Sequence, residues 1–253
     1  MRYGKLAIAS LFVLAASTVQ AQTVYSGADL NAGPGNLHPI SAAAAAAFDT
    51  AAGALGTVNL INFESSPVGS FASLTPVPGV TLTGMDYQNN QLYVNNTPNF
   101  PIAPALDGFN VTSGGAKYVE QIGGTATFTF SSPIQAFGVY LTGVQVGFFQ
   151  DTITFNDGTF KTINVPTQFP SNNSNGSLSF VGFTDSGKFI SQVTITASNN
   201  FGADAIGIDD VRFVNSPANS SVPEPGVNAL LIGMGITGAG FLARRRRSAR
   251  KVA

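Results

Sequence analysis

An alternation of apolar and polar residues with a period of two runs through this chain from Thr57 onward, and it limits the possible folds more than any other feature. Thr-Ala-Thr-Phe-Thr-Phe at 125–130 and Thr-Ile-Thr-Phe at 152–155 are two of the clearest runs. Asn-Asp-Gly at 156–158 follows the second run, and an Asp-Gly pair between two such runs is a strong hairpin signal. β-Branched and aromatic residues dominate the runs, and no helical repeat competes with them. The pattern predicts an all-β fold, an antiparallel β-sandwich of the jelly-roll kind.

The sandwich domain is predicted to span residues 57–215, and a leader of residues 22–56 precedes it. Residues 22–39 are rich in glycine, asparagine and proline, so we expect them to be poorly ordered. Residues 42–52 are mostly alanine, which has the highest helix propensity, and they predict a short helix with Ser41 as its N-cap. The alternative interpretation of this segment is a flexible alanine-rich linker.

The last predicted strand carries an irregularity. Its sequence is Ile-Gly-Ile-Asp-Asp-Val-Arg-Phe at 206–213. The two isoleucines share one parity, whereas the valine and the phenylalanine share the other, so a regular strand would place the two pairs on opposite faces. We therefore expect a β-bulge at Asp209 and Asp210, because one extra residue there keeps all four apolar side chains in the core.

The N-terminus has the three parts of a secretory signal peptide in the usual order. Arg2 and Lys5 supply positive charge, residues 6–16 are apolar, and Val-Gln-Ala at 19–21 has the small residues of a cleavage site. We expect residues 1–21 to form a signal peptide that signal peptidase removes after Ala21.

The C-terminus carries a second ordered signal. Residues 216–226 form a linker that contains Pro-Glu-Pro, residues 227–243 are seventeen residues without a charge, and residues 244–253 are a basic tail that begins with four arginines. An apolar helix of this length is at the short end of what crosses a hydrocarbon core, and the arginines would remain on the cytoplasmic side. We predict a transmembrane helix at 227–243; the alternative is a buried C-terminal helix with a solvated basic tail.

This order of a Pro-Glu-Pro triplet, a glycine-rich apolar segment and an arginine cluster resembles the PEP-CTERM sorting signal of Gram-negative bacteria. The resemblance implies that exosortase, a membrane protease, recognises the tail and cuts it near Pro223, Glu224 and Pro225. It also implies an inner-membrane-anchored precursor that later reaches the cell surface or the extracellular matrix, where such proteins are associated with exopolysaccharide and biofilm. After cleavage the mature protein would have no membrane helix.

The net charge of −1 hides a strong separation of charge along the chain. Eight of the twelve basic residues lie in the two targeting ends, whereas twelve of the thirteen acidic residues lie in the body between them. The body therefore has a net charge near −8. This charge argues against nucleic acid and anionic lipid as partners of the body, because phosphate binding needs clustered lysine and arginine. Cation binding suits such a surface better.

Two carboxylates of the last strand suggest where a cation could bind. Glu64 directly follows the first core strand, and first and last strands are often neighbours in sandwiches, so Glu64 could meet Asp209 or Asp210. Calcium takes six to eight oxygen ligands, commonly from carboxylates and backbone carbonyls. The two strand sequences resemble those of carbohydrate-binding-module-like jelly rolls, and this resemblance implies a structural calcium here. The alternative is that Asp210 pairs with Arg212 or a turn amide while Asp209 is solvated.

No catalytic centre is predicted, and we expect the protein not to be an enzyme. The chain has one histidine, His38, in the leader and no cysteine, which argues against a zinc site and against Ser-His-Asp or Cys-His centres. Asp151 and Asp157 flank a hairpin strand and could form a glycosidase pair. Asp157 is better explained as a turn residue, and Asp151 as a charge at the end of a strand.

Sugar binding is predicted only in outline. Sugar sites of this kind combine aromatic rings with a few amides, and Tyr87, Tyr93 and Tyr118 lie in an asparagine-rich segment at 85–118. The alternative is a long polar connection whose tyrosines are partly buried. We expect a non-enzymatic surface or matrix protein that binds polysaccharide or neighbouring surface components. A purely structural envelope or biofilm protein is the main alternative, and an extracellular glycoside hydrolase is the third.

Overall fold

A computed structural model of the chain describes residues 22–30, 32–98, 108–144, 151–166, 177–186, 188–198 and 204–216. The described residues all belong to one compact unit. The predicted signal peptide, transmembrane helix and basic tail lie outside the described residues. No helix within the described ranges is long and apolar enough to span a bilayer.

The described residues form one helix and thirteen strands, and every strand pair is antiparallel. This confirms the predicted all-β antiparallel fold. The elements are β1 (Thr23–Leu30), α1 (Pro39–Gly53), β2 (Asn59–Ile61), β3 (Gly69–Phe71), β4 (Ser73–Val77), β5 (Val80–Met85), β6 (Leu92–Asn95), β7 (Tyr118–Ile122), β8 (Gly124–Val144), β9 (Thr152–Asn156), β10 (Phe160–Asn164), β11 (Ser177–Thr184), β12 (Ile190–Ala197) and β13 (Ala205–Asn215).

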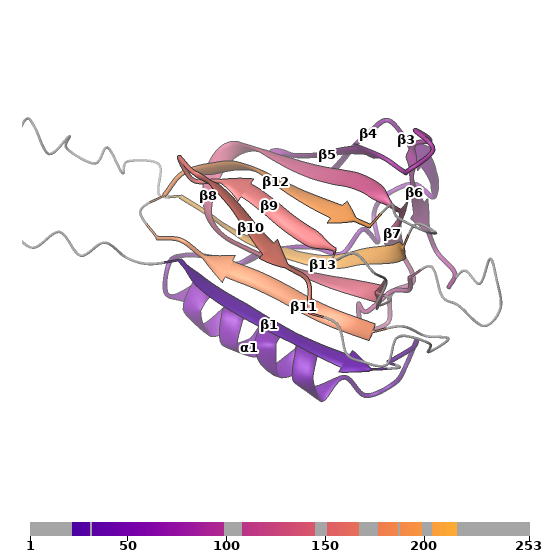
Figure 1. The fold of residues 1–253 in the computed structure, drawn as a ribbon, viewed down its shortest axis with the longest axis horizontal. Helices are drawn as coiled ribbons and strands as arrows, with labels where there is room; N and C mark the ends of the chain where they lie inside the picture. Colours follow the sequence, from indigo (N-terminus) through magenta and orange to yellow (C-terminus); the bar gives the residue numbers. More distant parts are fainter. Residues whose placement is uncertain are drawn as a thin grey trace, which may run out of the picture. The chain divides into compact units, whose positions relative to one another are not determined.

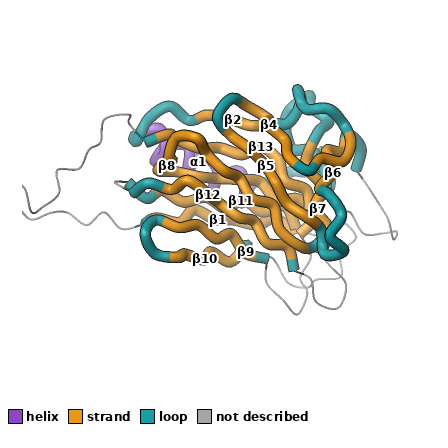
Figure 2. The backbone as a smooth tube through the Cα atoms, turned by 90° about the horizontal axis from the view of Figure 1, so that it is seen from above, coloured by secondary structure: helices purple, strands orange, loops and turns teal. Residues whose placement is uncertain are grey.

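The long strand β8 belongs to both layers of the sandwich (Figure 1). Its first half pairs with β5 and β12, and β4, β9 and β10 complete that first layer. Its second half pairs with β11 and β13, and β1, β2, β3, β6 and β7 complete the second layer. The strands therefore form one continuous hydrogen-bonded network that turns from one layer into the other along β8, with the β9–β10 hairpin at one margin (Figure 2).

Phenylalanine side chains fill the space between the two layers. The rings of Phe155, from the first layer, and Phe183, from the second, stack with centroids 3.9 Å apart. Phe128 and Phe137, from the two halves of β8, lie 5.7 Å apart. All four belong to one cluster of buried apolar residues that draws on both layers. The alternation seen in the sequence is explained by this core, because every second residue of these strands must point into it.

Helix α1 covers the outer face of the second layer and packs against β1 and β11 (Figure 1). Its Phe48 is fully buried in a second apolar cluster. Gly138 and Gly182 face each other across β8 and β11, and a Cβ atom on either would approach the Phe48 ring to 3.0 Å or less. The glycine pair therefore leaves room for the ring of Phe48 directly on the sheet.

The leader differs from the prediction. Residues 23–30 are not poorly ordered, because all eight residues of β1 pair with β11 at the edge of the second layer. The helix is confirmed, although it begins at Pro39, three residues earlier than expected, and Ser41 is not its N-cap. Small residues in β1 obscured the strand pattern in the sequence. One of them, Gly27, is required by the packing of helix α1 against the strand, because a Cβ at this position would lie 2.7 Å from the Ile40 carbonyl oxygen.

Candidate functional site

The predicted bulge of β13 is present. The register between β13 and β8 shifts between Asp209 and Arg212, and Asp210 has a positive φ of 46°. The four apolar residues on either side of the bulge are all buried in the main core. As expected, the first core strand β2 lies beside β13, with Ile61 opposite Val211. The bulge therefore sets the positions of the Asp209 and Asp210 carboxylates.

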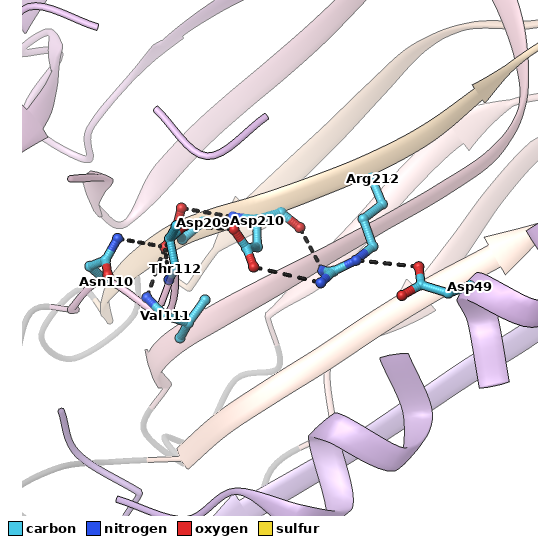
Figure 3. Close-up of polar contacts among 7 residues, drawn as sticks. All are labelled: Asp49, Asn110, Val111, Thr112, Asp209, Asp210 and Arg212. Atoms are coloured by element: carbon cyan, nitrogen blue, oxygen red, sulfur yellow. Dashed lines mark hydrogen bonds and ion pairs between the residues drawn. The ribbon is translucent and has the colours of Figure 1, made fainter. Parts of the chain in front are cut away.

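Asp209 is completely buried and serves as an anchor for the loop that precedes β7. Its Oδ2 accepts hydrogen bonds from the backbone amide of Val111 at 2.8 Å, the backbone amide of Thr112 at 3.2 Å and the side-chain amide of Asn110 at 3.1 Å (Figure 3). Its Oδ1 accepts one from the amide of Asp210 at 2.8 Å. Burial raises the pKa of Asp209 to about 7, although the hydrogen bond from Val111 lowers it in part. The expectation of a solvated Asp209 is wrong.

Glu64 meets Asp209 through one shared partner. The amide nitrogen Nδ2 of Asn110 donates to Glu64 Oε1 at 3.0 Å and to Asp209 Oδ2 at 3.1 Å. Glu64 Oε1 also accepts the backbone amides of Ala116 at 2.9 Å and Lys117 at 2.8 Å. The sequence-based expectation that the two carboxylates lie near each other thus agrees with the geometry, and both hold the same loop.

The donor set does not fit a calcium ion between Glu64 and Asp209. Calcium requires oxygen ligands around the ion, but here the Asn110 amide nitrogen donates to both carboxylates, and Glu64 Oε1 and Asp209 Oδ2 also accept hydrogen bonds from other N–H and O–H groups. No three acidic or histidine side chains among the described residues are grouped to hold a metal. A calcium at Glu64, Asp209 and Asp210 therefore stays a prediction without support from this arrangement.

Asp210 extends the network toward helix α1. Its Oδ1 accepts a 2.6 Å hydrogen bond from the Thr112 hydroxyl, and its Oδ2 lies 3.6 Å from Nη2 of Arg212. Arg212 also forms an ion pair with Asp49 of α1, with Nε and Oδ1 3.3 Å apart (Figure 3). The guanidinium carbon lies 5.2 Å from the centre of the Tyr140 ring. The expected Asp210–Arg212 pair is present, and the cluster as a whole ties loop, strand and helix together.

The three predicted ligand-binding tyrosines are in different environments. Tyr87 and Tyr93 are 47% and 40% exposed, so their rings are accessible. Tyr118 is fully buried, and its hydroxyl donates to the Thr97 carbonyl at 2.9 Å. A ligand platform at Tyr118 is therefore wrong, because the ring is not accessible to a ligand. Tyr87 lines a groove of about 540 Å³ beside β5 and β8.

The aspartates considered as a glycosidase pair are not brought together. Asp151 and Asp157 stand at opposite ends of β9, about 20 Å apart at about 3.3 Å per residue, whereas glycosidase carboxylates are separated by about 5–10 Å. Asp157 is the expected turn residue, since its Oδ1 accepts the Thr159 amide at 2.9 Å. Each has another acidic neighbour that the sequence pattern did not indicate: Asp204 for Asp151 and Asp185 for Asp157.

His38 and the anchored loop border the second groove, of about 560 Å³. The imidazole of His38 stands edge-on to the Tyr140 ring at 6.1 Å, and its Nδ1 lies 3.2 Å from the Asn36 carbonyl oxygen. The lining residues include Asn96, Asn110 and Thr112, and none of the lining residues is acidic, lysine or arginine. The groove is therefore lined by uncharged polar and apolar residues, with His38 as the one titratable side chain among them.

A feature missed from the sequence lies on the outer face of the first layer. Two rows of side chains cross this face from strand to strand, and neighbours within a row are paired positions on adjacent strands. None of them carries a charge, and all are half-buried or exposed. We call these two rows the threonine face. The first row is Ser73, Thr83, Thr127, Thr194, Thr154 and Thr162, and the second is Met85, Thr125, Thr196, Thr152 and Asn164.

The threonine face meets the Tyr87 groove at β5 and β8. Thr83, Thr125 and Thr127 belong to the face and also line the groove. The hydroxyls of Thr127 and Thr194 lie 3.0 Å apart, so the row is linked by at least one hydrogen bond. The sequence signal was present as repeated Thr-x-Thr, but the rows become visible only when the strand register is known.

Residues 221–247 match the family model of the PEP-CTERM protein-sorting motif. The chain carries a PEP-CTERM sorting signal. The match confirms the resemblance based on Pro223, Glu224 and Pro225, and it marks an exported protein whose membrane-anchored precursor is processed by exosortase and sorted to the cell surface. The matched residues lie in the tail, so the motif does not describe what the sandwich binds.

Comparisons of the body of the chain say little about function. Two solved structures of the catalytic domain of a GH87 α-1,3-glucanase, one with tetrasaccharides and one with nigerose, are similar to it at 16% identity. Their TM-scores are 0.27 and 0.25, and the similarity covers 63% and 62% of this chain but 31% of each of those chains. Likeness at this level transfers no activity. No curated protein matches the sequence.

Proposed function

We propose that this PEP-CTERM protein is a non-enzymatic component of the cell surface or extracellular matrix that binds neutral polysaccharide through the threonine face. The observation that supports the proposal most strongly is the uncharged hydroxyl row from Ser73 to Thr162, on a body whose net charge is near −8. An acidic body repels acidic polymers. An uncharged face, by contrast, can bind a neutral polymer without removing water from a charged side chain.

The chemistry of the face suits a polyhydroxylated chain. Each hydroxyl can donate one hydrogen bond and accept others, as sugar hydroxyls do. Adjacent strands lie about 4.8 Å apart, so six side chains in a row extend over about 24 Å. That length accommodates several sugar units in an extended chain. At the β5 end, the half-exposed ring of Tyr87 provides an apolar surface on which a sugar ring can stack.

The test is a co-sedimentation assay of the exported protein with insoluble neutral glucans and chitin, and with alginate as an acidic comparison. Wild-type protein is expected to bind at least one neutral polymer and not alginate. Thr154→Glu places a charge in the middle of the face and should weaken binding at least tenfold. Thr50→Glu, on the exposed side of α1, adds the same charge elsewhere and should leave binding unchanged.

Two results would contradict the proposal. Equal binding by the Thr154→Glu and Thr50→Glu variants would place the ligand on another surface. Failure of the wild-type protein to bind any neutral polymer would favour the second candidate function, a purely structural envelope or biofilm protein. Circular dichroism of both variants shows whether the fold is retained.

A further inference from the structure

Two β-turns of the same kind line the groove of about 560 Å³ beside His38. They are formed by residues 33–36 and 112–115, and in each the amide of the fourth residue donates to the carbonyl of the first, at 3.1 Å and 3.0 Å. The third residue of each turn is a glycine with a positive φ, 77° for Gly35 and 74° for Gly114, as type II turns require. A Cβ atom on either glycine would have nothing within 4 Å, so both turns border open space.

The second of these turns is held in place by two carboxylates. Asp209 accepts the backbone amide of Thr112, the first residue of the turn, at 3.2 Å. Glu64 accepts the backbone amide of Ala116, directly after the turn, at 2.9 Å. Because the protein itself orders this wall of the groove, a ligand does not have to order it, and the cost of binding is lower.

Two side chains of the groove can accept a hydrogen bond from a ligand. Asn110 lines the groove, and its Nδ2 donates to two carboxylate oxygens and one backbone carbonyl, at 3.0 to 3.1 Å. These three bonds fix the orientation of the amide, so its Oδ1 is the acceptor that it offers. Nδ1 of His38 lies 3.2 Å from the Asn36 carbonyl oxygen. In the neutral imidazole the proton is therefore on Nδ1, and Nε2 is the acceptor.

The lining of the groove favours a neutral ligand. None of the described residues that line it is acidic, lysine or arginine, and the body charge near −8 opposes an anion. Phe109 and Leu178 add apolar surface, since both line the groove although they are 2% and 1% exposed. A sugar unit combines hydroxyl donors with an apolar ring face, which matches acceptors beside apolar side chains. The volume lies within the range of small-molecule sites, about 300–1,000 Å³.

We propose that this groove binds a short neutral saccharide, whose hydroxyls donate to Asn110 Oδ1 and His38 Nε2 and whose ring contacts Phe109 and Leu178. The groove is built around the starts of α1 and β11 and the loop before β7, whereas the threonine face lies on the first layer. The two sites are therefore separate, and this proposal does not rest on polysaccharide binding by the threonine face. A free disaccharide and the end of a polysaccharide chain offer the same chemistry to the groove.

The experiment screens the exported protein on an array of immobilised neutral glycans. The Thr154→Glu variant is used throughout, so that the threonine face does not contribute. This protein should bind at least one glycan, and isothermal titration with the matching free disaccharide then gives the affinity. Binding of the immobilised glycan alone would also support the proposal and identify a chain end as the ligand.

Three further substitutions in this background locate the site. Ser113→Trp adds bulk at an exposed residue of the groove and should weaken binding at least tenfold. His38→Ala removes one acceptor and should weaken it at least threefold. Thr50→Trp adds the same ring about 18 Å further along α1, at about 1.5 Å per residue, and should leave binding unchanged.

Three results would overturn the proposal. The first is that the Thr154→Glu protein binds no neutral glycan. The second is equal binding after Ser113→Trp and Thr50→Trp. The third is unchanged binding after His38→Ala, which decides the question if circular dichroism shows that Ser113→Trp does not fold. A failure of the threonine face to bind polymers changes none of these measurements.

Discussion

The carboxylate of Asp29 accepts a 2.7 Å hydrogen bond from the backbone amide of Ser41, so a residue of strand β1 caps the N-terminus of helix α1. The other carboxylate oxygen accepts the Ile40 amide at 3.0 Å. The preceding residue His38 makes no side-chain cap of its own, and the first turn contains no acidic residue. Asp29 therefore satisfies two amides that the helix itself leaves open and places a negative charge at the positive end of the helix dipole.

Removal of this cap should destabilise the protein. Asp29→Ala leaves both amides without a partner and is expected to lower the free energy of unfolding by about 1–2 kcal/mol. Asp29→Asn keeps one acceptor oxygen and should lower it by a smaller amount. Urea denaturation followed by circular dichroism measures both values; equal stability of wild type and Asp29→Ala would show that water replaces the cap.

A second prediction follows from the close packing around Gly207. A Cβ at this position would lie 2.4 Å from the Thr142 hydroxyl and 3.0 Å from the Gly108 Cα. Gly207→Ala is therefore expected to lower the free energy of unfolding by about 1–3 kcal/mol through overpacking. Gly53→Ala is the control, because nothing lies within 4 Å of a Cβ there, and it should be neutral or slightly stabilising. The same loss in both variants would contradict the packing argument.

The buried carboxyl groups predict an unusual dependence of stability on pH. Burial raises the pKa of Asp209 to about 7, and burial together with Asp157 raises that of Asp185 to about 6, from an ordinary value of 3.8. Folding therefore favours the protonated forms, and their stabilising effect is present below pH 3.8 and is lost as the pH rises through 6 and 7.

The pKa of Asp157 is lowered, so this residue has the opposite effect on the pH dependence of stability. Burial by itself would raise its pKa, but hydrogen bonds from Thr159 outweigh this and lower the pKa to about 2. Its stabilising effect is present above pH 3.8 and is lost as the pH falls toward 2. Urea denaturation between pH 3 and pH 8 in EDTA should show stability that falls from pH 4 to pH 7, with a smaller fall in Asp209→Asn. A rise over that interval would contradict the assignment.

Phe48 should be the most sensitive position of the helix. Its ring is fully buried on the Gly138–Gly182 pair, with the Phe180 ring 5.6 Å away. Phe48→Ala is expected to lower the free energy of unfolding by about 3–5 kcal/mol, because it removes apolar burial and leaves a cavity. Phe160→Ala is the control, since Phe160 is 86% exposed on β10 and should change stability by less than about 0.5 kcal/mol.

The features that could be predicted from the sequence are those that depend on residues close along the chain. The parity change around Asp209 was enough to predict the bulge, and the strand order of sandwiches was enough to expect Glu64 nearby. The cap by Asp29 could not be predicted, because the helix offered Ser41 as a local candidate and the capping carboxylate comes from another strand. The Asp151–Asp204 contact and the threonine face depend on which strands are neighbours and in what register, which a single sequence does not reveal.

The pairing of β1 with β11 joins Thr23 to Thr184 and Leu30 to Ser177. Strand β1 can therefore form its hydrogen bonds only with a strand that lies about 150 residues further along the chain. Such distant contacts make folding slow. The second layer is therefore complete only once nearly the whole body of the chain is available.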